Sequence, residues 1–102
     1  MKVVLFRSHP KEGTYSDDYK DLSQHLVEVV SALPGFISVE LFRGPCGEAL
    51  ILAQFESDEA VAQWREHPEH REAQGRRNEF YTDYTVQVCT VDRNYGWRPE
   101  RT

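Results

Sequence analysis

The sequence predicts an α+β fold, a ferredoxin-like sandwich in which helices cover one face of an antiparallel sheet. Strand-like and helix-like segments follow one another in the order βαββαβ. The two middle strands are separated only by the turn sequence Gly44-Pro45-Cys46-Gly47, so they are expected to form a hairpin. Crossover connections in this order put both helical segments on the same face. The 102 residues have room for one domain, which we place at residues 1–102.

Four segments carry strand patterns. Residues 3–6 are β-branched or apolar and end before Pro10. Residues 36–42 alternate in hydrophobicity, and residues 49–55 are apolar at nearly every position. Residues 84–91 alternate again and form the last predicted strand.

The first helix is predicted between the first two strands. Thr14, followed three residues later by Asp17, matches an N-cap pattern. Pro34-Gly35 ends the helix. Apolar and aromatic side chains recur at helical spacing between these signals: Tyr19, Leu22, Leu26, Val29, Val30 and Leu33.

The second helical region is predicted to be broken. Ser57 is expected to cap its start. Pro68 lies where the helix would be in mid-course, and an internal proline costs about 3 kcal/mol. Because proline is tolerated at the first helical position, we expect two short helices, about 58–66 and 68–75.

The strands carry more apolar surface than one copy of the chain can cover. Residues 49–53 are apolar on both faces, and Val39 is expected to point away from Phe36 and Phe42. A second copy packed sheet to sheet would close a dimeric α+β barrel, so we predict an obligate homodimer. The aromatic residues Tyr95 and Trp97 of the tail would then lie on the partner. The alternative is one wet face with scattered apolar side chains.

Charge and cysteine content exclude several classes of protein. The net charge of −5, with no dominant basic cluster, argues against nucleic acid as a partner. Cys46 in a turn and Cys89 in a strand do not suggest a disulfide framework. The sequence shows no signal peptide and no apolar run of membrane-spanning length, so we predict a cytoplasmic protein without a membrane partner.

A family resemblance rests on three stretches: Trp64, the run Glu-His-Arg-Glu-Ala-Gln at 69–74, and Tyr-Thr-Val-Gln-Val-Cys-Thr-Val-Asp-Arg-Asn-Tyr-Gly at 84–96. Over nearly its whole length the chain resembles the antibiotic biosynthesis monooxygenase family of small dimeric α+β barrel proteins. Members of that family include quinone-forming monooxygenases without cofactors, haem-degrading monooxygenases and many proteins of unknown role.

The resemblance implies a pocket between helices and sheet in each subunit, with Trp64 as its wall. In the haem-degrading branch a histidine ten residues after this tryptophan binds iron, and an asparagine lies on the first strand. In this sequence Gln74 stands where that branch has the iron-binding histidine, and the first strand has no asparagine around Arg7. An amide is a poor iron ligand. We therefore expect no cofactor, with haem bound through His70 as the alternative.

The remaining candidates have both structural and chemical interpretations. Trp64 is spaced from Val61 as a core residue would be, and it could also wall a pocket. His67 and His70 lack the further ligands of a metal site, so we expect none; either could be a general base, and His67 could instead cap a helix. Tyr81 could pack or orient a hydroxyl.

Three basic residues gather at the end of the second helical region: Arg71, Arg76 and Arg77. They are interpreted as a solvated face in which Glu72 pairs with Arg76, or alternatively as an anion site.

Three functions are compatible with these residues. The first is a cofactor-independent monooxygenase acting on an aromatic phenol or quinol. Trp64 would be the wall, and His70 or His67 the acid or base. Contacts to the substrate would come from Arg7, Gln74 and Tyr81. The alternatives are haem binding and cleavage, and a non-catalytic dimer that binds a small apolar or aromatic ligand.

Overall fold

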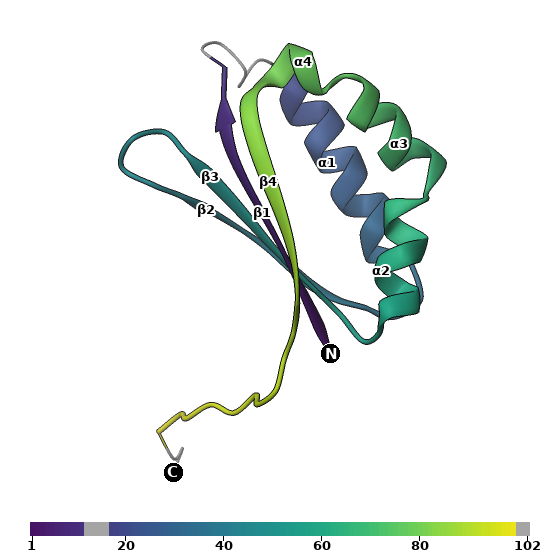
Figure 1. Ribbon diagram of the computed structural model, residues 1–102, viewed down its shortest axis with the longest axis vertical. Helices are drawn as coiled ribbons and strands as arrows, with labels where there is room; N and C mark the ends of the chain where they lie inside the picture. Colours follow the sequence, from purple (N-terminus) through teal and green to yellow (C-terminus); the bar gives the residue numbers. More distant parts are fainter. Residues whose placement is uncertain (12–16, 100–102) are drawn as a thin grey trace.

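The structure is a computed structural model that describes residues 1–11 and 17–99 (Figure 1). The predicted cap at Thr14 lies outside the described residues. The elements follow one another as β1 (Lys2–Pro10), α1 (Asp17–Ser31), β2 (Phe36–Arg43), β3 (Ala49–Phe55), α2 (Asp58–Arg65), α3 (Pro68–Gly75), α4 (Arg77–Phe80) and β4 (Tyr81–Thr90).

The four strands form one antiparallel sheet in the order β2-β3-β1-β4. The helices all lie on one side of this sheet (Figure 1). The predicted ferredoxin-like α+β fold is therefore confirmed. Strands β2 and β4 are the edge strands, so each has one neighbour within the described part of the chain.

Strands β1 and β4 are longer than the sequence predicts. They pair with each other from Lys2 opposite Thr90 to Pro10 opposite Tyr81, with a register shift after His9. Proline is tolerated at strand ends and bulges because it only removes a donor. Long-range pairing thus extends both strands beyond their apolar centres.

The break in the second helical region occurs as predicted. The Ser57 hydroxyl accepts the backbone N–H of Ala60 at 3.2 Å and caps α2. Pro68 begins α3, and the His67 ring caps that helix by accepting the N–H of Glu69 at 3.2 Å. The one-turn helix α4 was not predicted.

The core lies between the sheet and the helices. Phe55 is fully buried and packs with Val30, Ala60 and Val61. Partly buried residues surround this cluster: Val4, Leu33, Phe36, Ala53 and Trp64.

One prediction about side-chain direction is wrong. Phe36 was expected to point away from Val39, yet it packs in the helix-side core with its ring 6.0 Å from that of Phe55. The register between β2 and β3 shifts between Phe36 and Ser38. Such an irregularity adds a residue to one strand, so that the side chains before it point to the face opposite to the one that simple alternation predicts. Ile37, at the irregularity, is 44% exposed.

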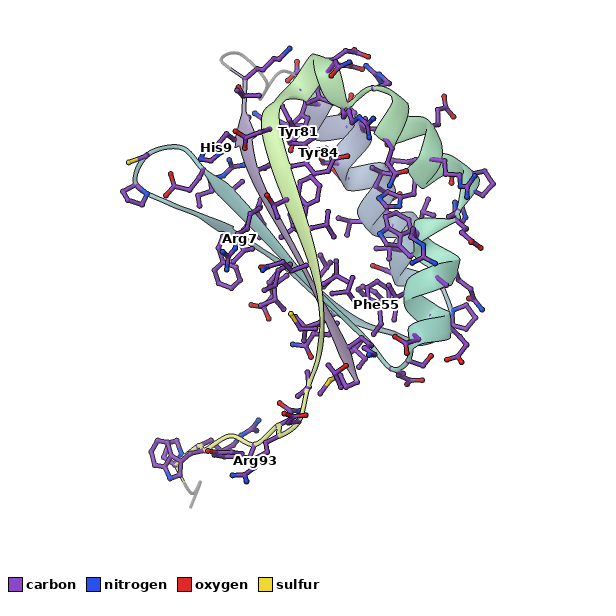
Figure 2. The ribbon with its side chains drawn as sticks, viewed as in Figure 1. Arg7, His9, Phe55, Tyr81, Tyr84 and Arg93 are labelled. Atoms are coloured by element: carbon purple, nitrogen blue, oxygen red, sulfur yellow. The ribbon has the colours of Figure 1, made fainter. Side chains whose placement is uncertain are left out.

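The opposite face of the sheet, which we call the outer face, carries no helix from residues 1–11 and 17–99. Alternation along the strands puts Leu5, opposite Leu52, on this face together with Phe42. Figure 2 shows Arg7 and His9 on this side as well. The outer face is therefore a mixture of apolar and charged side chains.

Residues 91–99, which follow β4, extend away from the body of the domain without regular secondary structure (Figure 1). Its aromatic side chains are almost fully exposed, Tyr95 at 89% and Trp97 at 86%. None of the helices in the described part of the chain has the length and hydropathy needed to span a bilayer.

Candidate functional site

The helix break brings Trp64 and His70 together. Six positions apart on a continuous helix of 3.6 residues per turn, these two side chains would point about 120° away from each other. Because the chain turns at His67 and Pro68, their rings stack instead, with centroids 4.2 Å apart and planes inclined by 12°. Trp64 also packs against the core cluster, which anchors the pair.

The hydrogen bonding of His70 defines its tautomer. Its Nδ1 lies 3.1 Å from the carbonyl oxygen of Trp64. A carbonyl can only accept, so Nδ1 carries a proton and the neutral ring keeps its lone pair on Nε2. Burial lowers the pKa of His70, with a smaller contribution from nearby His67, while the bond to Trp64 opposes the shift. His70 is therefore a neutral base at pH 7.

His67 has the opposite tautomer. Its Nδ1 accepts the Glu69 N–H, so in the neutral ring the proton is on Nε2. The ring centroid lies 6.2 Å from that of Trp64. His67 thus orients α3 and can donate a hydrogen bond toward the same region.

A second group of aromatic side chains lies between the sheet and α1. The Tyr84 ring stacks on Phe6 at 4.9 Å, and the Tyr81 ring meets Phe6 edge-on at 5.5 Å. The hydroxyls of Tyr19 and Tyr81 are 3.2 Å apart. Figure 2 shows Tyr81 and Tyr84 on the helix side of β4.

A cavity of about 320 Å³ opens where α4 meets β4, and we call it the junction cavity. Arg77 Nη1 donates to the Tyr84 hydroxyl oxygen at 3.3 Å within it. Its lining consists of Arg77, Asn78, Tyr81, Thr82, Asp83 and Tyr84.

A smaller cavity of about 220 Å³ lies between α1 and α3. His25 Nε2 lies 2.6 Å from a carboxylate oxygen of Glu69 at its rim. The bond to this carboxylate raises the pKa of His25 and lowers that of Glu69. This exposed pair links α1 to α3.

The structure brings some of the predicted site residues together and separates others. Trp64, His67 and His70 form one group, and Tyr81 belongs to the aromatic group beside Phe6. Arg7 points to the outer face, and Gln74 is exposed on α3. Neither cavity has Trp64 or His70 in its lining.

Sequence reasoning did not identify the pairing of Arg77 with Tyr84. The sequence did contain a signal for it, because Arg77 is one of the three basic residues for which an anion site was the alternative interpretation. Glu72 was expected to pair with Arg76, whereas Arg76 pairs with Asp18 at 2.7 Å and Glu79 at 3.0 Å. Within residues 1–11 and 17–99, no three potential metal ligands cluster.

Two comparisons of the sequence with known proteins identify relatives of this chain. The family model for antibiotic biosynthesis monooxygenase matches residues 1–76. The uncharacterized protein YqjZ of Bacillus subtilis (strain 168) is 32% identical over 92 residues, which cover 89% of this chain and 79% of that protein.

Many solved structures are similar in fold, and two of them illustrate the likeness. Rv0793 from Mycobacterium tuberculosis superimposes with a TM-score of 0.81 at 18% identity, over 93% of this chain and 98% of that one. The crystal structure of an antibiotic biosynthesis monooxygenase gives a TM-score of 0.75 at 19% identity, over 89% and 98% of the two chains. The match of the family model over residues 1–76, three quarters of the chain, leads to one conclusion: this chain belongs to the antibiotic biosynthesis monooxygenase family.

Proposed function

We propose that the protein is a cofactor-independent monooxygenase that oxidises an aromatic phenol or quinol. The observation that carries this proposal is the His70 ring, neutral, half-buried and anchored through Nδ1 to the Trp64 carbonyl. Its Nε2 is thereby prepared to accept a proton from a phenol. A phenolate is electron-rich enough to react with oxygen without a metal or flavin.

The reaction balances without a further reductant. The phenol gives its hydroxyl proton to His70 and its electrons to dioxygen, and a bond forms between oxygen and the ring carbon. Cleavage of the O–O bond leaves one oxygen on the ring as a quinone carbonyl. The other oxygen leaves as water, with the hydrogen atoms of the hydroxyl group and of the attacked carbon.

An apolar strip on β4 supports the binding of aromatic rings beside the helices. Val86 lies opposite Phe6 and Val88 opposite Val4, so both valines face the helix side. They remain 49% and 52% exposed, so the helices leave this strip open. We place the substrate rings on it.

Of the three residues predicted from the sequence to contact the substrate, Tyr81 remains a candidate, because it lies on the helix side with Tyr84. Arg7 is not assigned to the substrate site, because the pleat directs that side chain to the outer face. Gln74 is also left out, since its side chain is exposed on α3.

Oxygen uptake with a panel of naphthols and hydroxyanthraquinones, in the presence of a metal chelator, tests this function. We expect His70→Phe to reduce kcat by about 10²–10⁴-fold, because it keeps the ring stack on Trp64 and removes the base. His25→Phe, which changes a histidine on α1, should retain activity. The lowered pKa of His70 in the free protein predicts that the acid limb of the kcat/KM profile has its midpoint below pH 6.5.

Several results would contradict this function. Undiminished oxygen uptake by His70→Phe would exclude His70 as the base, and no turnover across the panel would leave a ligand-binding protein. A Soret band on haem titration, lost in His70→Phe, would support the haem-binding alternative.

We also propose that the chain acts as a homodimer through its outer face. Leu5 and Leu52 on that face, together with Trp97 of the extended tail, have no covering layer within the described part of one chain. Light scattering should give twice the chain mass of 11.9 kDa, and Leu52→Arg should weaken association. A folded species of 11.9 kDa at micromolar concentration would contradict the dimer.

The cytoplasmic location also stays a prediction.

A further inference from the structure

We propose that the junction cavity binds a small planar aromatic anion whose negative group is held by Arg77 and Tyr84. This binding site goes beyond the proposed function because it does not require turnover. Its lining residues, within 77–84, lie outside the stretch matched by the family model.

The aromatic wall of the cavity is held in place on several sides. Tyr84 stacks on Phe6 with planes inclined by 28°, and Tyr81 meets Tyr84 edge-on at 5.8 Å. Tyr81 is further fixed by the hydroxyl of Tyr19 at 3.2 Å. Rings positioned in this way offer a rigid surface on which a flat ligand can pack.

The hydrogen bond between Arg77 and Tyr84 leaves donors available for a ligand. Because Arg77 donates to the Tyr84 oxygen, the hydroxyl proton of Tyr84 points to some other acceptor. Among the residues that the structure describes, none accepts it. The remaining N–H groups of Arg77 lie beside this hydroxyl, and two neighbouring donors suit a carboxylate or phenolate oxygen.

The charge of the cavity is also suitable for an anion. Asp83 is the one carboxylate in the lining, and His9 Nδ1 binds its oxygen at 2.7 Å. That bond raises the pKa of His9, and the protonated ring offsets the charge of Asp83. Arg77 has no carboxylate partner within residues 1–11 and 17–99, in contrast to Arg76 with its two.

The size of the cavity limits the ligand. A volume of about 320 Å³ is at the lower end of the range for small-molecule sites, which is roughly 300–1,000 Å³. One or two fused rings with an anionic substituent fit this volume. Lys11 adds a positive charge nearby, since its ammonium donates to the Asn78 carbonyl.

The test measures equilibrium binding of 2-naphthoate and of its neutral analogue 2-naphthamide near pH 7. We expect the carboxylate to bind about tenfold more tightly than the amide. Arg77→Gln should abolish this preference. Tyr84→Phe, which keeps the stack on Phe6, should weaken it several-fold. Backbone amide NMR signals of Thr82 and Tyr84 should shift with 2-naphthoate.

Arg71→Gln is the matched control because Arg71 is exposed on α3 and does not line the cavity. Equal affinity for the two probes, absence of binding, or an equal loss in both arginine variants would overturn the proposal. Shifts confined to residues of the cavity between α1 and α3 would do the same. Binding of 2-naphthoate together with no oxygen uptake across the panel of naphthols and hydroxyanthraquinones would contradict only the monooxygenase function, so the two proposals can fail separately.

Discussion

Replacing Phe55 with alanine is expected to lower the free energy of unfolding by about 3–5 kcal/mol. The Phe55 side chain is 0% exposed, and its ring packs edge-on against Phe36 at 6.0 Å. It also contacts the cluster formed by Val30, Ala60 and Val61. Truncation would remove this apolar burial and leave a cavity between the sheet and the helices. Urea denaturation monitored by circular dichroism, at one fixed protein concentration, measures the loss.

Phe55→Leu provides a graded comparison at the same site. Leucine keeps much of the apolar volume, so we expect less than half of the loss seen with alanine. Similar losses for the two variants, or a loss below about 1 kcal/mol for alanine, would show that Phe55 is not the centre of the core.

Gly35→Ala is expected to destabilise the fold by about 2–5 kcal/mol in total, from two separate causes. Gly35 has φ of 82°, a left-handed conformation that costs other residues about 1–2 kcal/mol. A Cβ at this position would also lie 2.7 Å from the Cβ of Ala60, which is 4% exposed. The backbone there cannot move freely, because the Gly35 carbonyl accepts the Glu56 N–H at 2.8 Å.

Gly47→Ala separates the two causes. Gly47 has φ of 85° and no atom within 4 Å of a built Cβ, so only the backbone cost applies. We expect Gly35→Ala to be the more destabilising in urea, and Ala60→Gly to recover part of the loss in a double variant. Equal losses for the two glycine variants, or no coupling with Ala60→Gly, would contradict the close contact.

Local signals predicted the helical layer well. Ser57 caps α2 through an atom three residues away, and Pro68 ends one helix and begins the next. These effects act within one turn, so neighbouring residues suffice to predict them. The hairpin at residues 44–47 was predicted for the same reason. The uncovered outer face agrees with the apolar pattern, and the dimer itself stays a proposal.

Long-range pairing changed what local patterns indicated. Strand β1 continues to Pro10 because β4 lies beside it, and the irregularity after Phe36 moves that ring into the core. The one-turn helix α4 has no cap or periodic pattern by which it could be predicted. Each of these features depends on how distant segments meet.

By itself, the sequence determined the order of elements, the break between α2 and α3, and the family resemblance, because caps, proline and hydrophobic period act over a few residues. Only the tertiary structure decided which side chains meet. The stacking of His70 on Trp64 depends on the angle at which the chain turns, and the contact of Tyr19 with Tyr81 joins positions 62 residues apart. Arg7 and Phe6 are adjacent in sequence and lie on opposite faces of the sheet, since Phe6 packs on Tyr81 of the helix side and Arg7 points to the outer face. Contacts of this kind follow from packing in three dimensions, which spacing along the chain does not specify.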